Sequence, residues 1–156
     1  MNAKSILPFI DVTVHAFKEM FGVELEAKSP YLMRKDTPMD WEISGVIGIA
    51  GEARGVVVLS FQEDLAVALT GRLLGKKKAG MDEDVIDTVG EVVNIIAGNA
   101  KQGLEDSRLQ ISLPSIVMGR NHQVVWPSST IPIIGIPFTS LYGDFHLSVG
   151  LESLVL

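Results

Sequence analysis

Two carboxylates and an amide recur at helical spacing between residues 82 and 104: Asp87, Glu91 and Asn94, followed by Gly98. At about 100° per residue, these four positions fall within roughly 60° of one another on a helix. The opposite side of the same helix is apolar, with Val85, Val89, Val92, Val93, Ile96 and Ala100. The spacing therefore predicts a helix with one buried side and a polar strip, formed by Asp87, Glu91, Asn94 and Gly98, that faces water or a partner.

Most polar helix faces only keep a protein soluble, and this strip could have no other role. Asn94 favours a further role, because asparagine competes with helical hydrogen bonding and is poorly placed in the middle of a helix. Gly98 also costs about 1 kcal/mol relative to alanine there, and it would let another backbone come close. Gly90 has the same cost, which close packing of a neighbouring helix would explain equally well.

The chemistry open to this strip is limited. A glutamate and an asparagine one turn apart cannot supply a nucleophile with its general base. They can form a salt bridge and orient a water molecule. Such contributions suit a protein that assists hydrolysis of a phosphoryl group held by another molecule, where positioning and charge placement supply most of the catalysis.

The pattern Asp87-x-x-x-Glu91-x-x-Asn94 matches the signature (Asp/Ser)-x-x-x-Glu-x-x-Asn, and through it the chain resembles the CheC/CheX/FliY chemotaxis phosphatases. The surrounding sequence GEVVNIIAGNAK is similar to the CheX branch. Some members of this family carry the motif in each half, whereas Glu91 is the only one of the ten glutamates here with an asparagine three residues later. A single copy in the second long helix agrees with the CheX branch.

The resemblance implies an enzyme that hydrolyses the aspartyl phosphate of a phosphorylated CheY-type response regulator, ending a chemotaxis signal. It implies that Glu91 pairs with a cationic side chain of that partner and that Asn94 orients the attacking water. Glu91 and Asn94 are thus the expected catalytic residues, and Asp87, Glu91 and Gly98 the expected partner contacts. Asp87 is equally well explained as a solubilising residue. No cofactor is expected in the chain itself, because the phosphorylated partner supplies Mg²⁺.

Two other functions are compatible with the strip. One is a non-catalytic adaptor that binds a response regulator, or a flagellar-switch-like component, through the same acidic surface. The other is a structural domain whose strip meets its own copy in a homodimer. The resemblance also implies a homodimer, although neither charge nor periodicity indicates one.

Length and composition exclude several classes of protein. The 156 residues, 47% of them apolar, fit one compact domain, residues 1–156. A net charge of −6 argues against binding nucleic acid or an anionic membrane. The basic run Lys76-Lys77-Lys78 is expected in a solvated turn after a helix. The chain has no cysteine, its three histidines are scattered, and neither a signal peptide nor an apolar span of about 20 residues is visible, so we expect a cytoplasmic protein without a metal site.

Periodicity and turn residues predict an α+β protein. Helices are expected at residues 3–21, 63–74 and 82–104. Strands are expected at residues 23–28, 41–50, 55–61, 109–119, 123–126, 131–142 and 145–151, with an irregular segment at 30–39. Hairpin turns are expected at residues 51–54 and at Gly143-Asp144, and the prolines at 127, 132 and 137 are expected at edges or bulges.

The two halves share an order of elements, namely a helix, strand segments and a hairpin. This order is consistent with an internal duplication of about residues 1–80 and 81–156. It agrees with what the resemblance implies, a pseudo-symmetric CheC/CheX-like fold in which two long helices pack on an extended antiparallel sheet.

Overall fold

The computed structural model describes residues 3–34, 39–104, 108–122, 124 and 131–153. Within these ranges three helices and eight strands follow one another. They are α1 (Ala3–Phe21), β1 (Glu26–Ala27), β2 (Tyr31–Leu32), β3 (Trp41–Gly51), β4 (Ala53–Phe61), α2 (Glu63–Leu74), α3 (Glu83–Gln102), β5 (Leu109–Ile111), β6 (Ser115–His122), β7 (Ile133–Ser140) and β8 (Gly143–Ser153). None of these helices is long and apolar enough to cross a membrane.

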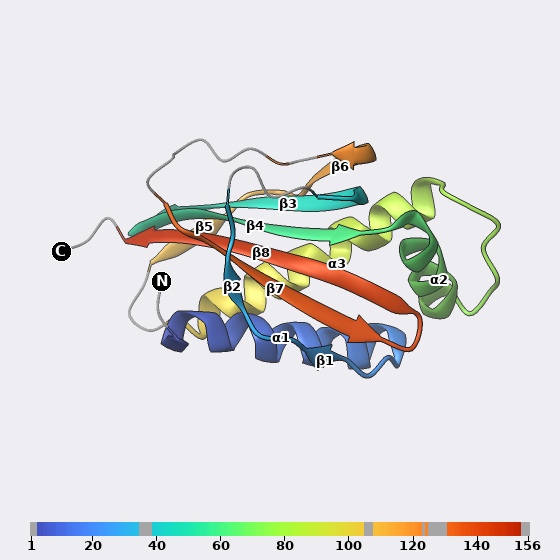
Figure 1. Cartoon of the computed structure of the whole chain (residues 1–156), viewed down its shortest axis with the longest axis horizontal. Helices are drawn as coiled ribbons and strands as arrows, with labels where there is room; N and C mark the ends of the chain where they lie inside the picture. Colours follow the sequence, from blue (N-terminus) through green and yellow to red (C-terminus); the bar gives the residue numbers. More distant parts are fainter. Residues whose placement is uncertain (1–2, 35–38, 105–107, 123, 125–130, 154–156) are drawn as a thin grey trace.

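The strands form one antiparallel sheet in the order β1-β7-β8-β4-β3-β5, with β2 also paired to β7 and β6 also paired to β3. The long helices α1 and α3 cover the same face of this sheet, and α2 lies at one end (Figure 1). Strands β4 and β8 meet at the centre. The short strands that follow α1 pair with the hairpin β7–β8, and those that follow α3 pair with the hairpin β3–β4. This reciprocal pairing shows the predicted pseudo-symmetric α+β fold.

The core lies between the sheet and the two long helices. On the helix-facing side of the sheet, alternate residues of the long strands β3, β4 and β8 are buried, among them Ile47, Val57 and Leu147, each 0% exposed. Phe17 of α1 stacks on Phe145 of β8 with ring centroids 4.5 Å apart. Aromatic burial of this kind is the largest apolar contribution a side chain can make, so α1 is held to the sheet mainly by its phenylalanines.

The first hairpin turn lies where the sequence predicts it, and the second is shifted. The pairs between β3 and β4 end at Ile49 and Gly55, so the predicted 51–54 turn lies between them, while the ends of the two strands continue by pairing with β5 and β8. In the second hairpin the turn is formed by Leu141-Tyr142, and Gly143 already pairs with Ser140. Leu141 is 99% exposed. Its apolar type concealed the turn, because turn predictions depend on glycine, proline, asparagine and aspartate.

Two predicted strands are interrupted. The expected strand 109–119 is divided into β5 and β6 by Ser112, Leu113 and Pro114, and proline removes the backbone donor that a continuous ladder would need. The expected strand 23–28 is reduced to β1, while the segment expected to be irregular contains β2. Most of the expected strand 123–126 lies outside the described residues.

Pro137 contradicts the expectation that prolines lie at edges or bulges. It is in the middle of β7, which has β8 on one side and β1 on the other. Its carbonyl accepts a hydrogen bond from the Lys28 N–H at 2.8 Å. In a regular antiparallel ladder, Lys28 and the residue at position 137 would exchange two backbone hydrogen bonds. Proline has no N–H, so only the bond from residue 137 to Lys28 is lost, just beyond the end of β1. Pro132 precedes β7, and Pro127 lies outside the described residues.

Candidate functional site

The start of α3 is fixed by a cap and by ion pairs. Asp82 is the N-cap, and its side chain accepts a hydrogen bond from the Val85 N–H at 3.1 Å. The Lys78 ammonium donates to Asp82 and, at 3.0 Å, to Asp84. These bonds raise the pKa of Lys78, and the bond from Lys78 lowers the pKa of Asp82. The Lys78 side chain is only 10% exposed, so the expected solvated lysine turn is wrong at this residue.

Beyond this start, α3 presents the polar strip outward as the spacing predicts. Asp87 and Glu91 are exposed, and Asn94 and Gly98 are half-buried. All six apolar residues predicted on the opposite side are buried: Val85, Val89, Val92, Val93, Ile96 and Ala100. Within the described part of the chain, the side chains of Asp87, Glu91 and Asn94 make no hydrogen bond or ion pair. The helix therefore brings a carboxylate pair and an amide to the surface with their bonding capacity unused.

The turn that carries Asn94 lies unusually close to the sheet. A Cβ atom added to Gly45 of β3 would lie only 2.8 Å from Cγ1 of Val93, the residue before Asn94. Glycine at this position therefore lets α3 approach β3 by the width of a methyl group. Because Val93 is 0% exposed, the backbone at Asn94 is set by packing in the core and not by surface contacts.

The two glycines of α3 are not required by internal packing. A Cβ atom at Gly98 would be 3.8 Å from Cδ1 of Ile111, an ordinary van der Waals contact. At Gly90 it would be 3.6 Å from Pro114 and 3.7 Å from Ile116. The neighbour of Gly90 is thus the segment around the start of β6, so the explanation by an adjacent helix is wrong. An alanine would fit at either position, so internal packing does not account for the cost of either glycine in a helix.

The family follows from a match over more than half of the chain. Residues 43–139, which include the whole polar strip, match the family model described as chemotaxis phosphatase CheX. The chain belongs to the CheX family. In this CheX-family protein the matched range contains the whole of α3.

Relatives of known name or structure agree with this membership. The CheY-P phosphatase CheX of Thermotoga maritima is 25% identical over 155 residues, which cover 96% of this chain and 97% of the relative. The structure of a CheC-like superfamily protein from Shewanella sp. PV-4 is 32% identical, with a TM-score of 0.89 and coverage of 98% of this chain and 100% of that one. The CheX–CheY–BeF3–Mg²⁺ complex from Borrelia burgdorferi gives 23% identity, a TM-score of 0.82 and coverage of 96% and 98%.

The face of the sheet that points away from α1 and α3 carries a polar network that the sequence did not indicate. His146 of β8 is 4% exposed and bonds through Nε2 to the Tyr31 hydroxyl at 2.7 Å and through Nδ1 to the Ser148 hydroxyl at 3.1 Å. Burial lowers the pKa of His146 to about 4, so the imidazole is neutral at physiological pH. Alternation of His146 and Ser148 with the core residue Leu147 was the available signal for their shared face.

A second group on that face joins the other strands. The Ser44 hydroxyl lies 2.7 Å from the Ser60 hydroxyl and 2.6 Å from Nε2 of His122, whose Nδ1 lies 2.8 Å from the Gly119 carbonyl oxygen. Ser44 is 0% exposed, so this serine cannot reach a substrate. These bonds tie β3, β4 and β6 together. In the described ranges no three metal-ligating side chains gather.

Proposed function

We propose that this protein dephosphorylates a phosphorylated CheY-type response regulator, and that Glu91 and Asn94 on α3 are the residues that do so. The observation that carries the proposal is the outward strip of a CheX-family helix, in which a carboxylate and an amide have no partner within the described chain. The name of the Thermotoga maritima relative, a CheY-P phosphatase, and the presence of CheY in the Borrelia burgdorferi complex support the choice of substrate.

Glu91 fixes the register of docking. Its carboxylate is exposed and unpaired among the described residues. It is therefore available to a lysine of the partner that lies beside the phosphorylated aspartate. A charge-assisted contact of this kind is roughly twice as strong as a neutral hydrogen bond and is directional. Asp87, one turn before, and Gly98, one turn after Asn94, extend the surface that the partner covers.

Asn94 acts on the water. Its amide carbonyl oxygen accepts a hydrogen bond from the attacking water and holds that water in line with phosphorus. Its NH₂ group stays free to donate hydrogen bonds to other acceptors in the partner's site. The water oxygen forms a bond to phosphorus while the bond from phosphorus to the aspartate oxygen breaks, which releases inorganic phosphate and a free carboxylate. A neutral group suits this position, because a second carboxylate beside the phosphoryl anion would repel it.

The remaining components belong to the partner. The leaving carboxylate and the Mg²⁺ ion are part of the response regulator's own site, and this chain contributes the positioning groups alone. The substrate is an intracellular signalling protein, so the proposal places this phosphatase in the cytoplasm. The homodimer that the family resemblance implies stays a prediction, which sedimentation velocity tests.

The test is a time course of dephosphorylation of a phosphorylated CheY-type protein with Mg²⁺. We expect Asn94→Ala and Asn94→Asp to lower the catalysed rate constant by about 10² or more, the cost of removing one positioning or stabilising contact. The matched control is Asn99→Ala, because Asn99 is an exposed asparagine on the same helix but lies about 100° from the centre of the strip.

Three outcomes separate the alternatives. If Asn94→Ala releases phosphate as fast as the wild type, the assigned site is wrong. If Asn99→Ala is as impaired as Asn94→Ala, the loss reflects damage to α3 and not the missing amide. If the wild type binds the phosphorylated regulator without accelerating its decay, the non-catalytic adaptor is the correct function.

A further inference from the structure

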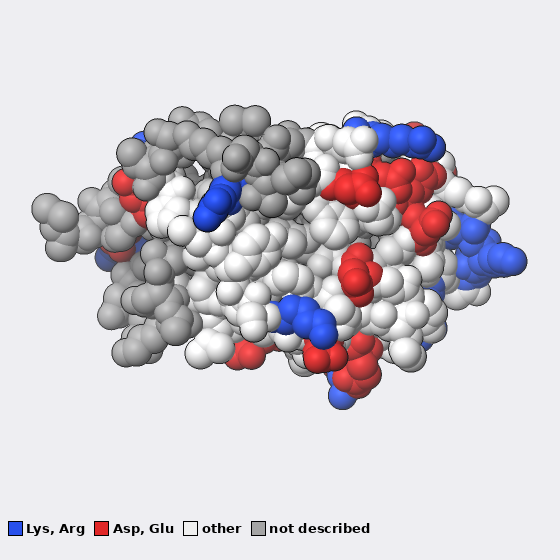
Figure 2. Space-filling model, in the orientation of Figure 1, with Lys and Arg blue, Asp and Glu red and all other residues white. Residues whose placement is uncertain are grey.

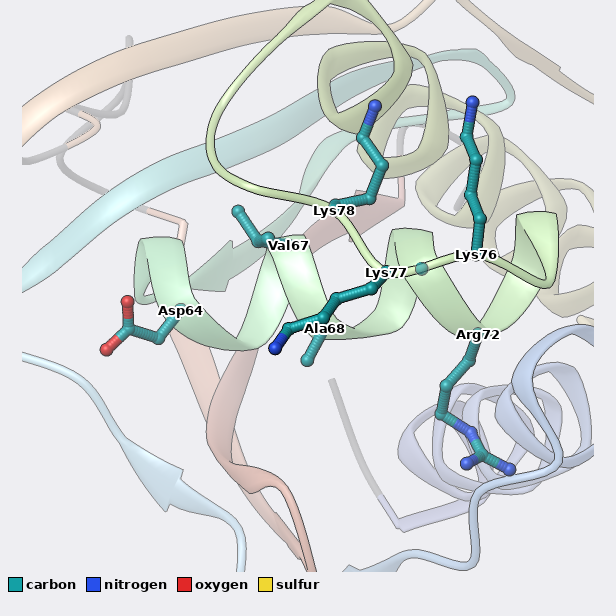
Figure 3. A pocket seen from close by; sticks show the side chains of 8 residues that line it. Asp64, Val67, Ala68, Arg72, Lys76, Lys77 and Lys78 are labelled. Atoms are coloured by element: carbon teal, nitrogen blue, oxygen red, sulfur yellow. The ribbon is translucent and has the colours of Figure 1, made fainter.

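A cationic hollow lies at the end of the molecule where α2 ends and the loop to α3 begins. Its floor is formed by Val67, Ala68 and Gly71 of α2, and its rim by Asp64, Arg72, Lys76, Lys77 and Lys78. Figure 2 shows Lys and Arg side chains gathered at this end of the molecule. In Figure 3, Lys76 and Lys78 extend from the loop in one direction, Arg72 extends in the opposite direction, and Lys77 runs along α2. In a chain of net charge −6, four cations around one apolar floor are a concentrated exception.

Two of these cations are not neutralised by a carboxylate of the described chain. The Lys78 ammonium is shared between Asp82 and Asp84, and Lys76 lies 3.9 Å from Asp84. Arg72 donates to neutral oxygens, namely the Phe21 carbonyl at 2.7 Å and the Tyr142 hydroxyl at 2.7 Å. These bonds hold its guanidinium rigidly while leaving its charge uncompensated. Lys77 is exposed and has no ion pair with any residue in the described ranges.

Asp84 links the hollow to the polar strip, because it pairs with two lysines of the hollow and lies on the side of α3 that carries the strip. Asp84 and Glu91 are seven residues apart on α3, which places them within about 20° of each other and about 10 Å apart along the axis. The Lys78 ammonium is bonded to Asp84, and Lys76 is beside it. A standard interface covers about 800 Å² on each partner, a patch of roughly 16 Å radius. A partner centred on Glu91 and Asn94 therefore covers the edge of the hollow.

Electrostatics assign the hollow a role in the proposed reaction. The strip presents the unpaired carboxylates of Asp87 and Glu91, and it must approach a partner's site that holds an aspartyl phosphate beside the lysine and the Mg²⁺ ion. The phosphoryl anion repels these carboxylates, and two carboxylates one turn apart do little to distinguish the two possible orientations of the partner along α3. A cationic group at one end of the strip removes both problems, since it attracts the partner and makes one orientation favourable.

We infer that the hollow of Arg72, Lys76, Lys77 and Lys78 is a second docking site for the response regulator, and that it binds an acidic surface segment beside the partner's phosphorylation site. This inference rests on the proposed function. The apolar floor of Val67 and Ala68 receives the aliphatic part of that segment, while Lys77 and Lys76 contact its carboxylates. Glu91 and the hollow then contact the partner at two points of opposite charge. Together they fix the partner's position along α3 and its orientation.

The test uses variants that spare the internal ion pairs. Lys77→Glu reverses a charge that has no partner in the described chain, and the double variant Lys76→Gln/Lys77→Gln removes two charges without opposing Asp84. We expect each to raise KM for the phosphorylated regulator about fivefold to tenfold at low ionic strength with kcat unchanged, and the difference to shrink as salt is added. The control for net charge is Lys28→Glu, an exposed lysine after β1 that pairs with the exposed Glu26 at 3.5 Å, and its KM is expected within twofold of wild type.

Binding is measured in parallel, as the Kd for the regulator activated with beryllium fluoride and Mg²⁺. An unchanged KM and Kd for Lys77→Glu overturn the docking site, and so does an equal increase in Lys28→Glu, which would show an effect of net charge alone. The two proposals fail separately. If Asn94→Ala is inactive while Lys77→Glu behaves as wild type, only the docking site is wrong. If Lys77→Glu weakens binding while the wild type does not accelerate dephosphorylation, only the catalytic proposal is wrong.

Discussion

The two long helices occupy related positions and yet have different surfaces. Both lie on the same face of the sheet, and the strands after each one pair with the hairpin of the other half. Their buried positions align at an offset of 80 residues, since Phe9, Thr13, Ala16 and Phe17 of α1 correspond to Val89, Val93, Ile96 and Ala97 of α3. One fold therefore provides two equivalent helical platforms.

Only one platform carries the residues for the proposed chemistry. At the same offset, the positions of Asp87, Glu91, Asn94 and Gly98 are occupied on α1 by Leu7, Asp11, Val14 and Lys18. Val14 cannot orient a water, and Lys18, which pairs with Glu24 at 3.6 Å, places a long cation where α3 has no side chain. A charged lysine there would repel the cationic group that Glu91 is proposed to bind. On the proposed function, the fold supplies the position of each helix, while a few surface residues supply the chemistry.

The inner faces differ as well. The α1 face contributes Phe9, Phe17 and Phe21, and Phe17 contacts the rings of Phe61 and Phe145. The α3 face contributes mainly valine, isoleucine and alanine, which fit against Gly45. Large rings give α1 more apolar area to bury, whereas small side chains let α3 lie close to the sheet. We infer that α1 mainly stabilises the fold and that α3 mainly positions the site.

The largest effect expected from this division is on stability. Phe17→Ala removes a ring that is 1% exposed and should lower the free energy of unfolding by about 3–5 kcal/mol, measured by urea titration. The rate constant for dephosphorylation, measured per folded molecule, should stay within twofold of wild type, because α1 has no part in the site. Leu7→Ala, on the outer side of the same helix, should change stability by less than about 0.5 kcal/mol. A catalytic loss in Phe17→Ala would contradict the division of roles.

A smaller effect, on KM, is expected when one carboxylate is removed from the outer face of α3 and, separately, from the outer face of α1. Glu91→Gln keeps the shape of the side chain but removes a charge-assisted contact, so KM should rise about tenfold while kcat changes little. Asp11→Asn at the equivalent position of α1 should leave both constants unchanged. If the two substitutions raise KM equally, α1 also contacts the partner and the two platforms are not functionally distinct.

The arrangement of the strip was predictable from sequence because it depends on local geometry alone. Helical spacing placed Asp87, Glu91 and Asn94 on one side and six apolar residues on the other, and the structure confirms both sets. The catalytic roles of Glu91 and Asn94 stay predictions. The helix boundaries were also close, since α1 and α2 have the expected limits and Asp82 is the cap of α3, which ends at Gln102 and not at the expected residue 104.

Features that depend on contacts distant in sequence could not be predicted. The approach of Gly45 to Val93 requires the packed structure. The burial of Lys78 depends on how the loop before α3 folds back, although its partners Asp82 and Asp84 are close in sequence. The cationic hollow also escaped notice, since Arg72 and the lysine run gain their common surface only when the loop folds back on α2. The strand interrupted at Pro114 and the turn at Leu141-Tyr142 were missed for local reasons, because proline removes a backbone donor and the apolar Leu141 concealed the turn.

The smallest expected effect concerns how the two helices begin. The first turn of α1 has no acidic residue, whereas α3 begins at Asp82, whose bond with Lys78 lowers its pKa below the ordinary value of 3.8. A carboxylate with a lowered pKa in the folded state contributes stability above its unfolded pKa and loses that contribution as pH falls through the folded value. Asp82→Asn removes the charge but keeps a good N-cap, so its stability should fall less than that of wild type as the pH is lowered below the ordinary aspartate pKa of 3.8. Parallel acid profiles from urea titrations would show that the cap, and not the ion pair with Lys78, fixes the start of α3.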